Sequence, residues 1–325
     1  MSGGGGDPVK VIKAALYANG AIAVVKLIAF GVSGSAAMLA EGVHSLADTG
    51  NQGLLMMGIW RATKPDPTRY AFGVSKERYF WPFIVALLLF SVGGLFAIYE
   101  GIHKLHEPTA ATFESFWTLT EGPLLSLGVL AVATVFETYS CMVAWREFKA
   151  FAKGKKLREA LLGGKDPTIP LVLLEDIAAL LGLTIAFIAI AVAALTGNGV
   201  FDAVGSILIG VLLCGVAVII ARDTHGLLIG ERATPEAEAQ AQVLTEKTPG
   251  VRGVTQLLTV HLGPDHVILA MKVAFEEGST LPRVEAIIDD IEKRVRAEMP
   301  EMKKIFVEPD SDGDLRGVVQ KLASA

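Results

Sequence analysis

Six predominantly apolar stretches, each of about 20 residues or more, constrain the fold of this chain more than any other feature. A helix that rises 1.5 Å per residue needs about 20 residues to cross the hydrocarbon core of a bilayer. The stretches run approximately over residues 11–32, 36–61, 79–105, 123–145, 170–195 and 201–221. The sequence therefore predicts an α-helical polytopic membrane protein with six transmembrane helices.

The composition excludes several other classes of protein. The chain is 52% hydrophobic, which is too apolar for an ordinary soluble enzyme, but its 19% charged residues leave room for a solvated domain. The net charge of -5 gives no reason to expect a nucleic-acid partner. Cys141 and Cys214 lie in apolar runs without CxxC spacing, so we expect neither a disulfide framework nor a thiolate zinc site.

The composition becomes that of a soluble domain after residue 232. Helical periodicity at 235–247 and 281–299, with strand-like stretches at 254–262, 267–275 and 304–308, predicts a C-terminal α+β domain of order αββαβ, ferredoxin-like. We therefore expect four parts: a flexible N-terminal tail (1–10), a membrane domain (11–232), a cytoplasmic α+β domain (233–310) and a C-terminal tail (311–325).

The distribution of basic residues predicts the orientation. Lys and Arg are concentrated in the loops at 61–78 and 146–165, whereas the opposite side carries essentially only Lys104. Because cytoplasmic loops carry the excess of basic residues, both termini are expected in the cytoplasm, with the spans in the cell inner membrane or an equivalent organelle membrane. The first ten residues show no signal-peptide pattern, so the first span is expected to be retained.

Ionisable residues interrupt the second apolar stretch. Glu41, His44 and Asp48 recur there at helical spacing, and such residues rarely persist at membrane depth without a partner or a function. His44 and Asp48 are four residues apart, so they share one helix face and can bind one ion. Imidazole with carboxylate suits Zn²⁺ above all, with Mn²⁺, Fe²⁺ or Co²⁺ as alternatives. Lys26, in the first span, is either a packing residue, snorkelling or paired in the interior, or a functional one.

Further carboxylates lie in the other spans. Glu175 and Asp176 are adjacent in the fifth span and point about 100° apart, so at most one is expected to share the ion fully. Glu137 in the fourth span is interpreted equally well as a ligand or as a packing residue. Glu100 and Asp202 are interpreted as residues of the membrane interfaces.

Four segments together resemble the cation diffusion facilitators, which are proton-coupled exporters of Zn²⁺ and related ions. They are SGSAAMLAEGVHSLADTGNQ, PDPTRYAFGVSKERYFW, YEGIHKLHEP and RDTHGLLIGE. The resemblance covers nearly the whole chain and implies six spans, an αββαβ tail and a homodimer that often forms through that tail. The run VLLEDIAALLG resembles the branch that contains the eukaryotic mitochondrial zinc exporter and its bacterial relatives.

The resemblance also implies a transport site. Members of the family place one HxxxD or DxxxD pair on the second span and another on the fifth. His44 and Asp48 match the first pair and Asp176 matches the carboxylate of the second, but the remaining position is Val172, which cannot ligate. The site is then either completed by water or recruits Glu175 or Glu137, and an oxygen-richer site is less selective for Zn²⁺.

Other metal sites of the family are not expected here. The resemblance gives Glu41 a gating or helix-pairing role outside the coordination shell. Tyr70 and Val74, instead of histidines, flank the Phe-Gly pair of the first basic loop. His261 and His266 flank the tail hairpin and are interpreted as solvated turn residues, so metal sensing by the tail is not expected.

Taken together, these features predict a divalent-cation transporter that exports Zn²⁺ by alternating access, with protons as the counter-ion. A Mn²⁺, Fe²⁺ or Co²⁺ exporter of the same fold is the first alternative. A membrane scaffold and an uncoupled channel are the others. No enzymatic activity and no bound cofactor are expected, and the predicted partners are the metal ion, the lipid bilayer and a second copy of the chain.

Overall fold

The computed structural model describes residues 6–33, 36–64, 66–106, 123–152, 154 and 156–311, without the side chains of residues 30, 32–33, 36–44 and 123–126. Glu41 and His44 thus have a described backbone but no described side chain. The chain divides into two compact units. The first comprises Met1–Thr63 and Glu77–His225, and the second comprises Lys64–Lys76 and Gly226–Ala325.

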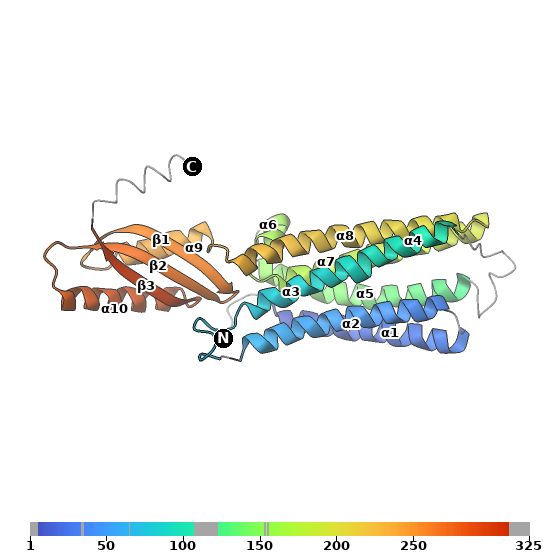
Figure 1. Cartoon of the computed structure of the whole chain (residues 1–325), viewed down its shortest axis with the longest axis horizontal. Coiled ribbons are helices and arrows are strands. Elements are labelled where there is room, and N and C mark those ends of the chain that lie inside the picture. Colours follow the sequence, from blue (N-terminus) through green and yellow to red (C-terminus); the bar gives the residue numbers. More distant parts are fainter. Residues whose placement is uncertain are drawn as a thin grey trace. The chain divides into compact units, whose positions relative to one another are not determined.

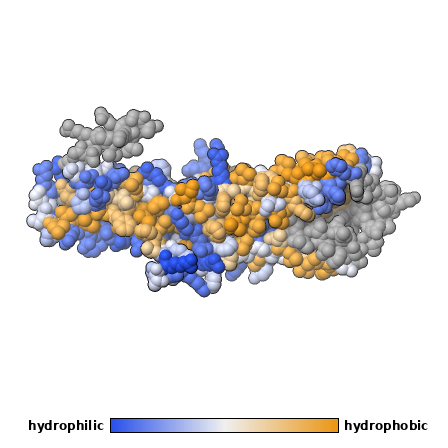
Figure 2. All heavy atoms as spheres, viewed as in Figure 1, coloured by the Kyte–Doolittle hydropathy of each residue, from blue (hydrophilic) through white to orange (hydrophobic). Residues whose placement is uncertain are grey.

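Long helices make up the first unit (Figure 1). They are α1 (Pro8–Ser33), α2 (Ala36–Ala62), α3 (Glu77–Leu88), which continues through the π-helix η1 (Leu89–Leu95) into α4 (Phe96–His106), α5 (Pro123–Ala152), α7 (Thr168–Thr196) and α8 (Val200–Ile229), with the short α6 (Leu157–Leu162) before α7. Orange, hydrophobic side chains cover much of the surface of these helices (Figure 2), as expected for helices that face lipid.

Within the described residues, five spans are long and apolar enough to cross a membrane: Pro8–Ala29, Glu77–His106, Leu127–Ala152, Thr168–Thr196 and Val200–Ile229. The helix α2 is less apolar, because Asp48, Asn51 and Gln52 lie in its middle. Its 27 residues nevertheless give a length of roughly 40 Å, enough to cross a bilayer. With α2 counted, the helices agree with the prediction of six transmembrane helices.

The helix formed by α3, η1 and α4 approaches α8 closely because glycines face the contact. A Cβ atom on Gly210 would lie 2.7 Å from the carbonyl oxygen of Gly94 and 2.6 Å from Cγ1 of Ile98. A Cβ on Gly101 would lie 2.8 Å from the carbonyl oxygen of Ala203. Small residues of this kind let two membrane helices bring their backbones together, and the contact tolerates no larger side chain.

The second unit contains the tail. Its elements are α9 (Pro235–Glu246), β1 (Val251–Gly263), β2 (His266–Phe275), α10 (Leu281–Glu298) and β3 (Met302–Asp310). The sheet has the order β1-β2-β3, with β1 antiparallel and β3 parallel to β2. Alternate residues of β2, including Leu269 and Val273, pack on Ile287 and Ile291 of α10, because side chains of a strand alternate between the two faces. The predicted αββαβ order is confirmed, and β1 and β3 are longer than predicted.

The basic loop 64–76 packs within the second unit. Oγ of Ser75 is hydrogen-bonded to Nδ1 of His266 at 3.1 Å, and Nζ of Lys76 donates to the carbonyl oxygen of Leu228 at 3.0 Å. The ring of Phe72 meets that of Phe306 edge to face, with centroids 6.4 Å apart. The loop that follows α2 in the sequence is therefore held by the tail.

The interpretation of His261 and His266 as solvated turn residues is wrong. His261 lies inside β1, where a strand was predicted, but it is only 5% exposed and has its Nδ1 3.2 Å from the carbonyl oxygen of Gly263. His266 is half-buried beside Ser75. The turn is shorter than predicted, so His266 is the first residue of β2.

Replacing Gly210 by Ala tests the glycine contact. The added methyl group would press on Gly94 and Ile98, so Gly210→Ala is expected to destabilise the protein by about 1–3 kcal/mol, the usual effect of overpacking. Gly215→Ala is the control, because a Cβ at Gly215 on the same helix has no neighbour within 4 Å. Thermal unfolding of the full chain in detergent should separate the two variants. Equal melting temperatures would contradict the contact.

The pH dependence of the second unit tests the environment of His266. Burial, followed by the charges of Lys303 and Lys304, lowers the pKa of His266 below its ordinary value of 6.5. The unfolded chain then binds the proton more readily than the folded one, so stability is fully present above about pH 6.5 and is lost as the pH falls below it. Melting temperatures of the wild type and of His266→Gln, compared across this range, should show a smaller acid loss in the variant. An equal loss would contradict this role.

Candidate metal centre

Two adjacent carboxylates are buried in α7 and point to different neighbours. Glu175 is 8% exposed and Asp176 is 2% exposed. Nε2 of Gln52 on α2 donates to Oε2 of Glu175 at 2.8 Å, whereas Oγ of Ser140 on α5 donates to Oδ2 of Asp176 at 2.8 Å. The 100° between successive helical residues explains this division. Each carboxylate links α7 to another helix.

The polar residues of α2 form a stripe along one helix face. His44, Asp48 and Gln52 follow one another at intervals of four residues on this helix. Asp48 is half-buried and Gln52 is fully buried. The backbone of His44 lies one turn before Asp48, as predicted, and its side chain is outside the described residues.

A buried ammonium group lies beside this stripe. Lys26 on α1 is 8% exposed, and its Nζ donates to Oγ of Ser45 at 2.9 Å. The charge of Lys26 also acts on Glu137 of α5. Lys26 is therefore paired in the interior and does not snorkel to the membrane surface.

The predicted carboxylate ligands lie close enough in the interior to influence one another electrostatically. Glu137 interacts electrostatically with Asp48 and Asp176, and Glu175 interacts with all three. Among the residues whose side chains the structure describes, no three His, Cys, Asp or Glu residues form a group that could hold a metal ion. The structure thus brings carboxylates from α2, α5 and α7 into one region, and the donor set of oxygens suits a divalent cation.

A groove opens beside Asp48. It has a volume of about 270 Å³ and is lined by residues of α2, α3 and η1. The lining residues are Ala47, Asp48, Gly50, Asn51, Leu54, Leu88, Leu89, Val92 and Gly93. Asp48 can therefore be reached from the surface of the first unit along the contact between α2 and the helix that includes η1.

Val172 lies where the second ligand of α7 would stand. It is 0% exposed and belongs to an apolar cluster with Ile169, Leu173 and Leu55. Its side chain packs and offers no ligand atom.

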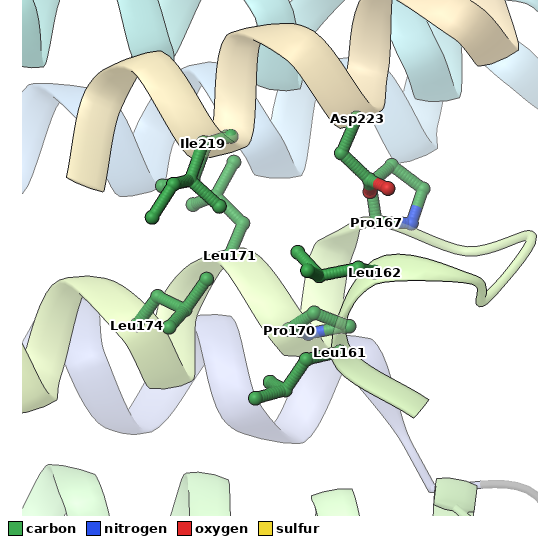
Figure 3. A pocket seen from close by; sticks show the side chains of 9 residues that line it. Leu161, Leu162, Pro167, Pro170, Leu171, Leu174, Ile219 and Asp223 are labelled. Carbon is green, nitrogen blue, oxygen red and sulfur yellow. The ribbon is translucent and has the colours of Figure 1, made fainter. Parts of the chain in front are cut away.

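A second hollow of the same unit is unsuited to a cargo ion. It lies where α6 meets α7 and α8 and is lined mostly by apolar side chains such as Leu161, Pro170 and Ile219 (Figure 3). Its volume of about 10 Å³ holds one water molecule at most. It is a packing defect between helix ends.

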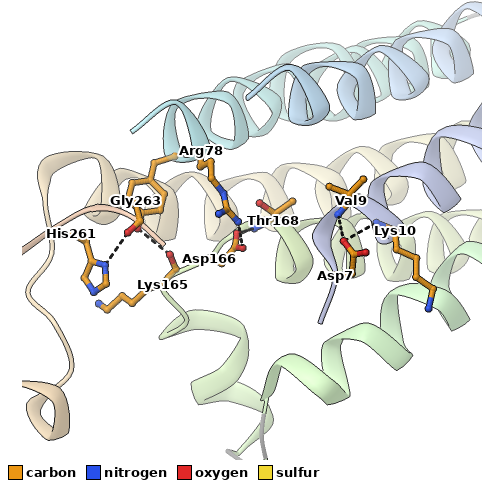
Figure 4. Close-up of polar contacts among 10 residues, drawn as sticks. Asp7, Val9, Lys10, Arg78, Lys165, Asp166, Thr168, His261 and Gly263 are labelled. Carbon is orange, nitrogen blue, oxygen red and sulfur yellow. Dashed lines mark hydrogen bonds and ion pairs between the residues drawn. The ribbon is translucent and has the colours of Figure 1, made fainter. Parts of the chain in front are cut away.

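Two further groups of charged residues in this unit lie near helix ends. Arg78 and Asp166 form an ion pair that joins α3 to the start of α7, and Oδ1 of Asp166 also accepts from the backbone N–H of Thr168 at 3.1 Å (Figure 4). At another point Nζ of Lys104 lies 3.1 Å from Asp202 and 3.7 Å from Glu100. Glu100 and Asp202 are thus engaged with Lys104 and are absent from the carboxylate group described above.

Three polar partners were not anticipated from the sequence. Gln52, Ser140 and Ser45 are each buried and hydrogen-bonded to a charged side chain. Gln52 had a usable signal, because it continues the four-residue spacing of His44 and Asp48. Ser45 and Ser140 had none, because serine is common in packed membrane helices.

Comparisons with known proteins agree with this arrangement. A family model described as the cation efflux transmembrane domain matches residues 12–229, and another described as the cytoplasmic domain of the cation efflux protein matches residues 234–312.

Mitochondrial proton-coupled zinc antiporter SLC30A9 of Mus musculus is 33% identical over 272 residues, which is 83% of this chain and 46% of that protein. Magnetosome protein MamB of Magnetospirillum gryphiswaldense is 26% identical over 283 residues, or 86% of each chain. A solved C-terminal domain of MamM, with 18% identity and a TM-score of 0.23, covers 23% of this chain and 95% of that domain. The chain spans about half the length of SLC30A9.

The fold and the buried carboxylates define a multi-pass membrane protein with a small α+β domain at its C-terminus. Since a single family model accounts for most of the membrane unit and a second one for the tail, the chain belongs to the cation efflux family, the cation diffusion facilitators. Membership in this family of transporters agrees with the expectation that the chain is not an enzyme.

Ser140→Ala tests the positioning of Asp176. Loss of the hydroxyl donor leaves the carboxylate less well oriented, so if Asp176 is a metal ligand, Zn²⁺ affinity falls about 10-fold, as when a partner of a metal ligand is removed. Thr134→Val on the same helix is the control, because the hydroxyl of Thr134 is exposed and bonds only to the carbonyl oxygen of Leu130 among the described residues. Calorimetric titration of the purified variants measures the Zn²⁺ affinity of each. An unchanged affinity in folded Ser140→Ala would rule out the positioning role.

Proposed function

We propose that this protein exports divalent metal cations in exchange for protons, with Zn²⁺ as the main substrate. The observation that carries the proposal is the convergence of Asp48, Glu137, Glu175 and Asp176 in the interior of the helices. Carboxylates at membrane depth are expensive unless a function retains them. Membership in the cation efflux family and the likeness to SLC30A9, a proton-coupled zinc antiporter, support the same function.

His44, Asp48 and Asp176 are the proposed ligands of the transported ion. Val172 supplies none, so a further oxygen comes from Glu137 or Glu175. The positions support this set, because His44 precedes Asp48 by one turn of α2 and the Asp176 carboxylate interacts with its neighbours on α5. We refer to these residues as the transport site.

Competition between protons and the metal ion provides the coupling. A carboxylate or imidazole must lose its proton before it coordinates a cation, so metal binding releases protons and protonation expels the metal. On the cytoplasmic side the deprotonated transport site takes up the ion. When the helices expose the transport site to the opposite side, protons replace the ion. The Lys26 ammonium beside Glu137 offsets part of the carboxylate charge while no metal is bound.

The oxygen-rich donor set favours one alternative substrate class. Carboxylate oxygen and water also suit Mn²⁺, and Fe²⁺ or Co²⁺ accept the same mixed set with one imidazole. An exporter of these ions would have the same architecture.

The remaining proposals concern topology and assembly. We place both termini in the cytoplasm, because the loops at 61–78 and 146–165 carry the excess of basic residues. We place the spans in the cell inner membrane. The segments 1–10, 11–232, 233–310 and 311–325 are proposed as N-terminal tail, membrane domain, dimerisation domain and C-terminal tail. A homodimer through the domain at 233–310 is supported by its match to the cytoplasmic domain of the family.

Metal uptake into proteoliposomes tests the function. With an imposed pH gradient, Asp48→Asn and Asp176→Asn are each expected to reduce the initial rate of Zn²⁺ uptake by at least about 10-fold, because each removes a charged ligand. Asp202→Asn is the control, since this carboxylate pairs with Lys104 away from the transport site. Parallel assays with Mn²⁺, Fe²⁺ and Co²⁺ identify the preferred substrate.

Three outcomes would contradict the proposal. Wild-type rates of Zn²⁺ uptake in Asp48→Asn or Asp176→Asn would show that the substituted residue is not a ligand of the transported ion. Metal flux that does not depend on the pH gradient would indicate a channel. Absence of both flux and metal-dependent thermal stabilisation would indicate a scaffold in which the buried charges only hold helices together.

A further inference from the structure

Gln52 and Glu175 form a buried pair with two unpartnered oxygen atoms. Gln52 is 0% exposed and Glu175 is 8% exposed, and Nε2 of Gln52 donates to Oε2 of Glu175 at 2.8 Å. The other oxygen of each group, Oε1 of Gln52 and Oε1 of Glu175, is buried and accepts no hydrogen bond from the described residues. Both groups thus use one atom to hold each other and leave one oxygen unsatisfied.

Unsatisfied oxygens of this kind indicate a ligand. A buried acceptor without a partner is costly, so native proteins seldom leave two of them in neighbouring groups. Both orphan atoms belong to groups that are directly hydrogen-bonded, so one cation can satisfy both. A proton on Oε1 of Glu175, donated to Oε1 of Gln52, is the competing arrangement, and the metal-binding experiment below distinguishes the two. An amide oxygen and a carboxylate oxygen are hard ligands that suit Mn²⁺ well and also accept Zn²⁺.

The pair lies on one side of the transport site. Gln52 follows Asp48 by four residues, about 6 Å along α2 in the direction of the basic loop 64–76. Glu175 precedes Asp176 on α7, in the direction of the basic residues before α7. Given the proposed orientation, the pair stands between the transport site and the cytoplasm.

We propose that Oε1 of Gln52 and Oε1 of Glu175 bind a divalent cation on its way from the cytoplasm to the transport site. This outer site rests on the proposed function and extends it, and it leaves Glu137 to complete the transport site itself. The neutral amide gives the outer site only one negative charge, so it binds the ion more weakly than the transport site and releases it inward. Weak binding before a stronger site permits entry without trapping.

Two substitutions at Gln52 separate a ligand from a simple hydrogen-bonding role. Gln52→Met removes the oxygen and keeps the length of the side chain. Gln52→Glu keeps an oxygen ligand, adds a charge and removes the Nε2 donor to Glu175. A ligand role predicts opposite effects of the two variants, whereas a hydrogen-bonding role predicts that both are defective.

The experiment uses the full chain in lipid nanodiscs for binding and in proteoliposomes for uptake, with Mn²⁺ as the probe. Electron paramagnetic resonance of free Mn²⁺ is expected to show two classes of binding in the wild type. Gln52→Met should lose the weaker class and raise the KM for uptake about 10-fold with kcat little changed. Gln52→Glu should bind Mn²⁺ about 10-fold more tightly in that class and lower kcat. The double variant Asp48→Asn, Asp176→Asn should keep the weaker class.

Several results would overturn the outer site. They are a single class of Mn²⁺ binding in the wild type, loss of all binding in the double variant, or equal defects in Gln52→Met and Gln52→Glu. If Gln52→Met does not fold, Gln52→Glu alone is sufficient. Tighter Mn²⁺ binding in the weaker class supports the outer site, and loss of that class overturns it. Normal uptake by Asp48→Asn would instead refute the proposed function. If Asp48→Asn loses uptake but Gln52→Met keeps an unchanged KM, only the outer site is refuted.

Discussion

Lipid cannot solvate a charged or strongly polar group, so every such group in the membrane helices must find its partner inside the protein. Glu175 finds Gln52, Asp176 finds Ser140 and Lys26 finds Ser45. These three contacts join α2 to α7, α5 to α7 and α1 to α2. The interactions that keep buried charges tolerable are therefore the same ones that assemble these helices around the candidate metal centre.

A different principle holds the helix made of α3, η1 and α4 against α8. There Gly94, Gly101 and Gly210 let the backbones approach directly, and the ion pair of Lys104 with Asp202 also joins α4 to α8. Apart from that ion pair, the contact depends on close packing. The same helix also contacts α2, where a Cβ on Gly58 would lie 2.9 Å from Cδ1 of Trp81, but a groove remains beside Asp48. This helix thus packs tightly on α8 and less completely on α2.

Hydropathy and periodicity predicted the spans and the αββαβ tail, because long apolar runs and alternating strands follow directly from burial. The helical spacing of His44 and Asp48, with Asp176 in another span, predicted a set of ligands that stays a prediction. It could not predict their neutral partners, since one Ser or Gln in an apolar helix does not reveal its orientation. His261 lay within the predicted strand, but its burial depends on long-range packing, which leaves no local signal. The π-helix η1 could not be predicted from the sequence either, since its wider turn is set by packing.

The loop 64–76 has a consequence for the order of synthesis. Its partners His266 and Phe306 are separated from it by residues 77–225, the remaining helices of the first unit. At ordinary translation rates the ribosome needs on the order of ten seconds to make that stretch. During this time Ser75 and Phe72 have neither His266 nor Phe306 to contact. A chain cut short before β2 would keep this loop without the contacts that hold it in the complete fold.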